Sequence, residues 1–184
     1  MKVGDKMINK AIIFATNAHS GAVRKGTTMP YIMHPLEASV IVSQMTTDQE
    51  LIAAAVLHDT VEDCEDITIE DIKQAFGERV AQLVSAESED KTKTWQERKS
   101  HTLEFLENEA TDDVKIVTLG DKLSNMRAIA RDYKVIGEGL WDRFNVKDKE
   151  KIGWYYKGIG DSLSSMSQYS AYQEYMQLVD EVFR

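Results

Sequence analysis

Two histidines and two aspartates are the residues of this chain best suited to hold one divalent metal ion. They are His34, the adjacent pair His58 and Asp59, and Asp121. Imidazole and carboxylate ligands together suit manganese, iron, zinc or nickel better than calcium or magnesium, and two carboxylates would neutralise a divalent ion and leave positions for water. Manganese or iron fits a six-coordinate site best. The sequence therefore predicts one catalytic metal, with Mn²⁺ as the first choice and Fe²⁺, Zn²⁺ or Ni²⁺ as alternatives.

His58 and Asp59 are neighbours in the chain, which limits where they can meet on one ion. Adjacent side chains on a helix diverge by about 100°. The pair could converge only beside a helix end or on a wide inner surface. Either geometry requires an enclosing fold.

Asp121 interrupts a stretch that is otherwise apolar at helical spacing. A carboxylate taken out of water costs several kcal/mol unless a cation or hydrogen bonds compensate. A metal ion would compensate that cost. The alternative is a carboxylate paired with Lys122 or Arg127 on a partly exposed face, but the presence of His34 and the His58-Asp59 pair favours the metal.

Glu62 and Asp63 are candidate catalytic carboxylates. They follow His58 and Asp59 by four residues, so a continuing helix would place them on the same faces one turn on. There they could orient or deprotonate a water molecule bound to the metal. A solvated acidic loop is the alternative interpretation, since more acidic residues follow, but the preceding His-Asp pair favours a site.

An amide and two cations could border the metal and hold phosphate groups. Asn125 lies one turn after Asp121, and Arg24 and Lys25 lie shortly before His34. Guanidinium and ammonium groups bind phosphate oxygens through charge-assisted hydrogen bonds.

Three other reactive side chains are predicted to serve the structure rather than the chemistry. His19 falls on the apolar stripe of the first helix, which predicts a hydrogen-bonded core histidine. His101 has no partner pattern and is expected on a helix surface. Cys64 is the single cysteine, so it cannot form an internal disulfide, and we expect a packed thiol in a reducing compartment.

Apolar residues recur at helical spacing along most of the chain, which predicts a nearly all-helical protein. Residues 51–57 are apolar nearly all round, which predicts a helix sunk in the core with His58 and Asp59 at its buried carboxyl end. The other apolar stripes are Ile8, Ile12, Ala15; Ile116, Leu119, Leu123, Met126; and Ile152, Tyr156, Ile159, Leu163, Met166.

Capping signals predict several helix starts. Thr47 with Glu50 has the spacing of a capping box. Thr94 with Glu97 has the same spacing, and Thr68 precedes an acidic first turn.

Two further residues indicate helix boundaries. Gly77 is predicted to end a helix at Phe76. Pro35 is predicted as a first helical residue, because its missing amide would be unpaired there, and this would hold His34 at a helix mouth.

Length and charge restrict the class of protein. With 184 residues, two prolines, and no linker or repeat, the chain fits one domain, residues 1–184. Twenty-two basic against 31 acidic residues give a net charge of −9, which argues against nucleic acid as a partner, so an anionic small substrate would need a local cationic pocket. Without a signal-peptide core or a membrane-spanning apolar run, we expect a cytoplasmic protein that does not associate with membranes.

Five ordered blocks of the sequence resemble the HD-domain superfamily. Within it they are most similar to the RelA/SpoT-type guanosine polyphosphate hydrolases, especially the small single-domain alarmone hydrolases related to the metazoan SpoT homologue. The resemblance covers about residues 8–131. The blocks are Ala18-His19 with Arg24-Lys25; Pro30-Tyr31-Ile32-Met33-His34-Pro35; Leu57-His58-Asp59-Thr60-Val61-Glu62-Asp63; Phe76-Gly77 with Glu97-Arg98-Lys99; and Gly120-Asp121-Lys122-Leu123-Ser124-Asn125-Met126-Arg127.

This resemblance implies an all-α, single-domain HD-type helical bundle and a role for each matching residue. Glu62 and Asp63 would be the catalytic carboxylates. Lys91 and Arg98 would approach the substrate phosphates. The implied metal ligands are His34, His58, Asp59 and Asp121, and the implied lining of the nucleotide pocket is Arg24, Lys25, Tyr31 and Asn125.

The resemblance also implies an activity: hydrolysis of the 3′-diphosphate of guanosine 3′,5′-bis(diphosphate) to give GDP or GTP and pyrophosphate. No synthetase domain is expected to follow, so the chain should hydrolyse alarmone but not make it. Cys64 stands where a threonine is common, and Gly120 replaces a usual alanine. The aromatic segment 141–183, with predicted helices within 148–183, matches nothing in the family pattern.

Three alternatives remain at this point. One is an HD-type phosphatase that acts on a deoxynucleotide or on the 2′-phosphate of NADPH and releases orthophosphate. Another is a non-catalytic nucleotide sensor whose aromatic tail docks a partner. The third is a two-histidine, one-carboxylate iron oxygenase, which usually needs a β-barrel, whereas no sustained period-two pattern is present.

Overall fold

Helices form nearly the whole chain, as the spacing of the apolar residues predicts. The computed structural model describes residues 3–184, and within that range strand pairing is limited to an isolated antiparallel bridge between Val23 and Pro30. The β-barrel expected of an iron oxygenase is therefore not formed by these residues. The helices are α1 (Val3–Ala18), α2 (Met33–Met45), α3 (Gln49–Leu57), α4 (Thr60–Asp63), α5 (Ile69–Phe76), α6 (Glu78–Glu87), α7 (Trp95–Asn108), α8 (Asp112–Ile136), α9 (Lys149–Ser162) and α10 (Ser170–Phe183), with 3₁₀ helices η1 (Gly137–Arg143) and η2 (Ser164–Met166).

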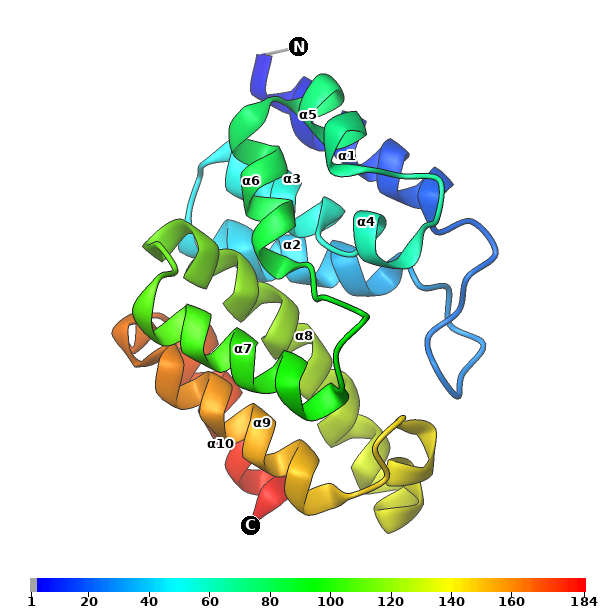
Figure 1. The fold of residues 1–184 in the computed structure, drawn as a ribbon, viewed down its shortest axis with the longest axis vertical. Helices are drawn as coiled ribbons and strands as arrows, with labels where there is room; N and C mark the ends of the chain where they lie inside the picture. Colours follow the sequence, from blue (N-terminus) through cyan, green and yellow to red (C-terminus); the bar gives the residue numbers. More distant parts are fainter. Residues whose placement is uncertain (1–2) are drawn as a thin grey trace.

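The long helix α8 runs between the two halves of the bundle (Figure 1). It packs against α2, α3 and α6 on one side and against α10 and η1 on the other. Helix α1 covers α3, while α9 packs on both α7 and α10. A side chain on the inner face of α8 can therefore meet residues from either half. Among the residues that the structure describes, no helix combines the length and the apolar character needed to cross a membrane.

Helix α3 is the centre of the first half. Every residue from Leu51 to Leu57 is buried, because this helix has apolar side chains nearly all round and packs on α1, α2, α6 and α8 at once. The helix ends at Leu57, and His58 follows as its buried C-cap. The imidazole of His58 thus lies at the buried carboxyl end of the core helix, as predicted.

The helix starts follow the predicted capping signals closely. Thr68 and Thr94 each form a complete capping box with the acidic residue three positions on. The predicted cap at Thr47 was wrong by one residue, since the side chain of Asp48 accepts the hydrogen bond from the amide of Glu50. Thr47 and Asp48 are adjacent and both are common N-cap residue types, so the backbone path decides which of them caps the helix.

The two predicted boundaries at Gly77 and Pro35 differ in outcome. Gly77 ends α5 with a φ of +95°, a conformation that residues with a side chain rarely adopt. Pro35 is not the first residue of α2 but the third, because the helix begins at Met33. The third position also lacks an intrahelical partner for its amide, so proline is tolerated there. His34 still lies in the first turn of α2.

The C-terminal segment packs into the same apolar core as the rest of the chain. Tyr175 is fully buried, and its hydroxyl donates to the carbonyl oxygen of Tyr156 at 2.7 Å. Phe183 stacks on Tyr156 and contacts Trp141. These aromatic contacts join α9, α10 and η1 into one layer beneath α8.

Gly120 allows α2 and α8 to approach closely. A Cβ atom at this position would lie 2.6 Å from Cγ2 of Val42 and 2.9 Å from the backbone oxygen of Ala38. We expect Gly120→Ala to destabilise the protein, because overpacking of this kind costs about 1 to 3 kcal/mol and the gain in helix propensity is at most about 1 kcal/mol. The midpoint of denaturant unfolding should fall. Gly139→Ala is the control, since a Cβ there meets open space; an unchanged midpoint for Gly120→Ala would show that the two helices separate without cost.

Candidate metal centre and active site

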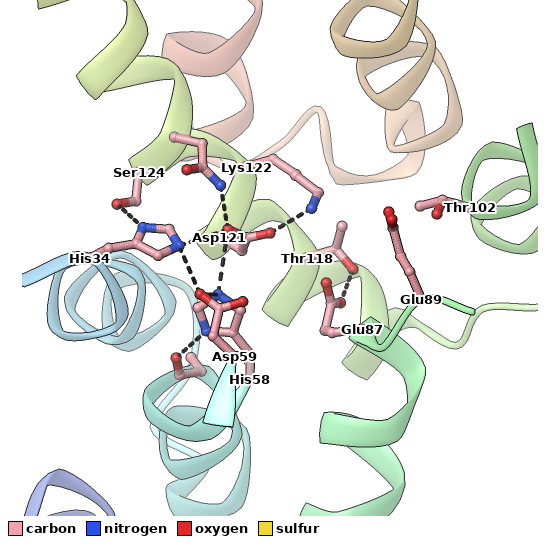
Figure 2. Close-up of polar contacts among 12 residues, drawn as sticks. His34, His58, Asp59, Glu87, Glu89, Thr102, Thr118, Asp121, Lys122 and Ser124 are labelled. Carbon is pink, nitrogen blue, oxygen red and sulfur yellow. Dashed lines mark hydrogen bonds and ion pairs between the residues drawn. The ribbon is translucent and has the colours of Figure 1, made fainter. Parts of the chain in front are cut away.

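Three of the predicted metal ligands meet at the centre of the bundle, although they come from three different helices or helix ends. Nε2 of His34, Nε2 of His58 and a carboxylate oxygen of Asp121 all lie within 4.8 Å of one another, and all three residues are buried. The Oδ1 atom of Asp121 is 3.1 Å from Nε2 of His34 and 3.5 Å from Nε2 of His58. Figure 2 shows the two imidazoles and this carboxylate pointing toward one another.

Asp59 contacts both histidines but lies outside that three-membered group. Its Oδ2 atom is 3.0 Å from Nε2 of His58 and 3.4 Å from Nε2 of His34. The hydroxyl of Tyr31 donates to the same oxygen at 2.7 Å. The structure therefore places this carboxylate beside the two imidazoles, where it can serve as a fourth oxygen donor.

The hydrogen bonds of His58 leave its Nε2 atom free for a metal. Its Nδ1 atom lies 2.9 Å from the carbonyl oxygen of Ala55, which can only accept, so Nδ1 donates its proton there and Nε2 is the nitrogen that faces the metal position. Nε2 is buried and has no hydrogen-bond partner. The donor separations of 3.1 and 3.5 Å are close to the roughly 3.0 to 3.4 Å between neighbouring ligands around an ion with bonds of about 2.1 Å. The residues present thus fit one divalent metal.

The charges around the cluster favour a cation at its centre. Burial opposes ionisation of Asp121, but Lys122 and His58 hold the pKa of this carboxyl well below its usual range. Burial also opposes ionisation of Asp59, whose pKa is nevertheless held well below its usual range by His58 and His34. Burial would lower the pKa of His58, yet the two carboxylates raise it well above its usual value. The two ionised carboxylates therefore stabilise positive charge between them, which a divalent ion supplies.

A cavity of about 300 Å³ opens onto the metal centre. Ten of the twelve site residues predicted from the sequence line it, including every predicted metal ligand and Glu62. The wall holds five acidic side chains and five cationic ones, and the cationic ones supply local positive charge for an anionic substrate. They are Arg24, Lys25, Arg98, Lys99 and Lys122.

Glu62 is half-buried in the wall of this cavity. Burial raises the pKa of its carboxyl, and the neighbouring charges of Asp59 and Glu89 raise it further. A carboxylate with a raised pKa is a better proton acceptor at neutral pH than an ordinary surface glutamate. Its position and its electrostatics therefore both suit a general base.

Asp63 and Lys91 are the two predicted site residues that do not line the cavity. The backbone does continue as the short helix α4, with the amide of Asp63 donating to the carbonyl oxygen of Asp59, but the Asp63 side chain is exposed. Lys91 donates to the carbonyl oxygen of Glu62 at 2.5 Å and lies 4.0 Å from its carboxylate. It therefore flanks Glu62 from outside the cavity wall.

The loop between α1 and α2 brings Arg24 and Lys25 to the cavity. The bridge between Val23 and Pro30 closes this loop, and the guanidinium of Arg24 donates to Asn125 at 2.9 Å. The ammonium of Lys25 donates to the side-chain oxygen of Asn145 at 2.6 Å. The loop is thus pinned to both α8 and the segment after η1.

Several cavity residues were not predicted from the sequence. Lys122 donates to Asp121 at 2.6 Å. Burial lowers the pKa of Lys122, but the carboxylate of Asp121 raises it more, so this pKa lies well above its usual value. Lys99 lies in the segment Glu97-Arg98-Lys99 that carries part of the family resemblance, but the resemblance implies no role for it. Lys99 and Lys122 could have been found because each adjoins a predicted site residue. Nothing in the sequence indicated that C-terminal residues would line the cavity. Those are Phe144, Asn145, Val146, Ile152, Tyr155 and Tyr156.

A cavity near Met33 shares Arg24 and His34 with the first, and two other cavities share more of its wall. One, of about 210 Å³, shares Arg24, Tyr31 and Asn125 with it and continues toward Leu140 and Phe144. The other, of about 500 Å³, lies between α6, α7 and α8 and shares with it Glu87, Glu89, Arg98 and Lys122. These two cavities therefore share parts of their walls with the cavity at the metal centre.

The residues predicted to serve the structure are buried or exposed as expected, although His19 lies just after the end of α1 and its buried Nε2 atom has no hydrogen-bond partner among the described residues. His19 is buried and packs on the ring of Tyr31 at 4.8 Å between centroids. Its Nδ1 atom is 3.7 Å from the sulfur of Cys64, which is a free and partly buried thiol. His101 is exposed on α7.

The family comparison assigns most of the chain to one family model. The model described as HD domain matches residues 11–137. Those residues include the second half of α1, the helices from α2 to α8 and all four predicted metal ligands.

Curated relatives match the same part of the chain. A protein of Aquifex aeolicus named guanosine-3′,5′-bis(diphosphate) 3′-pyrophosphohydrolase is 39% identical over 124 residues, which is 66% of this chain and 18% of that protein. A protein of Brucella ovis named GTP pyrophosphokinase rsh is 34% identical over 132 residues, 69% of this chain and 17% of that protein. The chain therefore spans less than a fifth of the length of these relatives.

Solved structures match more of the chain. A crystal structure of a protein from Listeria monocytogenes EGD-e has a TM-score of 0.74 and 31% identity, covering 82% of this chain and 98% of that one. A structure described as a metazoan ortholog of SpoT that hydrolyses ppGpp has a TM-score of 0.75 and 28% identity, covering 97% of this chain and 94% of that one. The second likeness extends over the C-terminal helices.

Proposed function

This chain belongs to the HD domain family, and from that membership we propose that it hydrolyses guanosine 3′,5′-bis(diphosphate) by removing the 3′-diphosphate. The products would be pyrophosphate and GDP, or GTP from the 5′-triphosphate form. The observation that carries the proposal is the buried His34, His58 and Asp121 cluster in a cavity with five cationic side chains, in a chain of net charge −9. The names of the Aquifex and metazoan relatives support this substrate.

We propose Mn²⁺ as the metal, with Fe²⁺, Zn²⁺ or Ni²⁺ able to occupy the same ligands. His34, His58 and Asp121 would hold it, and Asp59 would supply the fourth protein donor. When bound, the ion lowers the pKa of a coordinated water and neutralises charge that develops on the phosphate. Tyr31 keeps Asp59 in place by donating to its Oδ2 atom.

Glu62 accepts the proton of the attacking water in this proposal. Water attacks the phosphorus attached to the 3′ oxygen. The bond between this phosphorus and the 3′ oxygen breaks, and its electron pair stays on the 3′ oxygen. The raised pKa of Glu62 suits it to take up the proton of the water and to pass it to the 3′ oxygen. Asp63, one residue further, is proposed to assist from the exposed side of α4.

The cationic residues bind the substrate phosphates in this proposal. Arg24 and Lys25 are pinned by Asn125 and Asn145 and face the cavity from one side. Arg98 and Lys99 face it from α7, while Lys91 lies at its edge. Charge-assisted hydrogen bonds from both sides would hold a substrate with a diphosphate at each end.

The smaller adjoining cavity suits the nucleoside. Its wall includes the rings of Tyr31, Phe144 and Tyr156 and the apolar side chains of Ile129 and Leu140. A purine can stack on aromatic rings of this kind, with the guanidinium of Arg24 beside it. The C-terminal segment would thereby complete the same hydrolase unit as the helices before it.

The proposal is tested by identifying the products. Protein stripped with a chelator and resupplied with Mn²⁺ should release pyrophosphate from guanosine tetraphosphate, measured by a coupled pyrophosphate assay and by chromatography of GDP. The chelated protein should be inactive. Orthophosphate released from a deoxynucleotide or from NADPH, without pyrophosphate from the tetraphosphate, would replace our proposal by the phosphatase alternative. Nucleotide binding without any product would indicate a sensor.

A further inference from the structure

The two histidines of the metal centre are held in place by different kinds of partner. Nδ1 of His58 donates to the backbone oxygen of Ala55, a contact within one helical turn that no side-chain substitution removes. Nδ1 of His34 instead lies 2.8 Å from the hydroxyl oxygen of Ser124, which comes from α8 (Figure 2). The orientation of His34 therefore depends on a side chain from another helix.

Ser124 also determines which nitrogen of His34 carries the proton. Its hydroxyl lies 2.9 Å from Oε2 of Glu37 and donates to that carboxylate, which can only accept. A hydroxyl has a single proton, so the oxygen of Ser124 must accept from Nδ1 of His34. Nδ1 is thus protonated, and Nε2 presents its lone pair toward Asp121 and the metal position.

The hydrogen bonds continue from Glu37 to the C-terminal helix. Nη1 of Arg127 donates to Oε1 of Glu37 at 3.2 Å. The same guanidinium makes two hydrogen bonds of 2.7 Å to Glu174 on α10. One connected series of contacts therefore runs from His34 through α8 and α2 to α10, and its inner member, Ser124, is buried.

We propose that Ser124 and Glu37 are positioning residues that fix the tautomer and the ring orientation of His34 for metal binding. Arg127 on α8 in turn holds Glu37, and Glu174 on the C-terminal helix α10 holds Arg127. The inference rests on the proposed metal centre but not on the proposed substrate. It assigns a role in metal binding to a part of the chain that lies far in sequence from every predicted ligand.

The test measures the affinity of the chelator-stripped protein for Mn²⁺ without any nucleotide, by the electron paramagnetic resonance signal of free Mn²⁺. We expect Ser124→Ala to bind Mn²⁺ about 10- to 100-fold more weakly, the usual effect of removing an outer-shell partner of a metal ligand. Glu37→Gln should weaken binding in the same direction but less. Glu37 is half-buried, so this variant remains informative if Ser124→Ala folds poorly.

A double-mutant cycle separates positioning from a general effect on stability. If Glu37 acts through Ser124, then Glu37→Gln should have no further effect in the Ser124→Ala background, whereas independent structural effects would add. Ser39→Ala is the matched control, because Ser39 is a buried serine of α2 whose hydroxyl donates to the carbonyl oxygen of Leu36 and not to a ligand. It should bind Mn²⁺ as the unmodified protein does.

Three results would overturn the inference: unchanged Mn²⁺ affinity in Ser124→Ala, equal losses in Ser124→Ala and Ser39→Ala, or additive losses in the cycle. If the substrate is instead wrong, the unmodified protein should still bind Mn²⁺ and these variants should still weaken that binding as expected. No pyrophosphate should then be released from guanosine tetraphosphate. The two failures can therefore be told apart.

Discussion

Asp121→Asn is expected to abolish bound metal and turnover together. The carboxylate of Asp121 lies within contact of Nε2 of both histidines, and the substitution removes one of the two negative charges beside them while keeping the side chain's size. A metal ion contributes several kcal/mol to such a reaction, and each 1.36 kcal/mol is tenfold in rate, so we expect kcat/KM to fall by at least about 1000-fold. Metal content after dialysis and pyrophosphate release should be measured on the same preparation.

A control is needed because Asp121 also pairs with the buried Lys122. Asp59→Asn leaves that pair intact and should lose activity with less change in the thermal midpoint. Asp161→Asn alters an exposed aspartate of α9 and should change neither metal content nor rate. Full metal content in Asp121→Asn would remove this residue from the ligand set, and an equal rate loss in Asp161→Asn would point to an unspecific effect.

The meeting of His58 and Asp59 on one site could be anticipated from the sequence. Adjacent residues of a regular helix diverge by about 100°, so the pair required a helix end or a wide inner surface, and the all-apolar run before it indicated where a helix end would lie. The structure ends α3 at Leu57, with Asp59 as the residue before α4. Local pattern was sufficient here because the helix boundary and the chemistry coincide in one short segment.

The contacts that hold His34 could not be anticipated in the same way. Ser124 meets Nδ1 of His34 across the contact between α2 and α8, where Gly120, one turn earlier on α8, allows the two helices to approach closely. That register between two helices is a property of packing, and no spacing in the sequence encodes it. The same holds for Phe144 and Tyr156, which reach the cavity because the chain after α8 folds back along it.

Asp63 shows the limit of helical spacing as an argument. The hydrogen bond from its amide to Asp59 confirms that the backbone continues as a helix, yet α4 ends at Asp63 and Cys64 is extended. The side chain at the last position of a four-residue helix faces solvent rather than the cavity. Spacing predicted the backbone path but not how soon that path would end.

Glu62→Gln is expected to keep the metal and lose most turnover. Glutamine preserves the size of the side chain and its place in the cavity wall, but it cannot accept the proton of the attacking water. General-base catalysis typically contributes about 10²- to 10⁴-fold, so kcat should fall by that factor. Mn²⁺ affinity should be unchanged, because no contact joins Glu62 to the two histidines. The measurement is kcat for pyrophosphate release at saturating Mn²⁺, together with metal content.

Glu65→Gln is the matched control for this prediction, since Glu65 belongs to the same acidic run but is exposed. It should retain full turnover and full metal content. A fully active Glu62→Gln protein would mean that another group takes the proton, and Asp63→Asn would then be the next variant to measure. Loss of metal in Glu62→Gln would instead make Glu62 part of the metal centre.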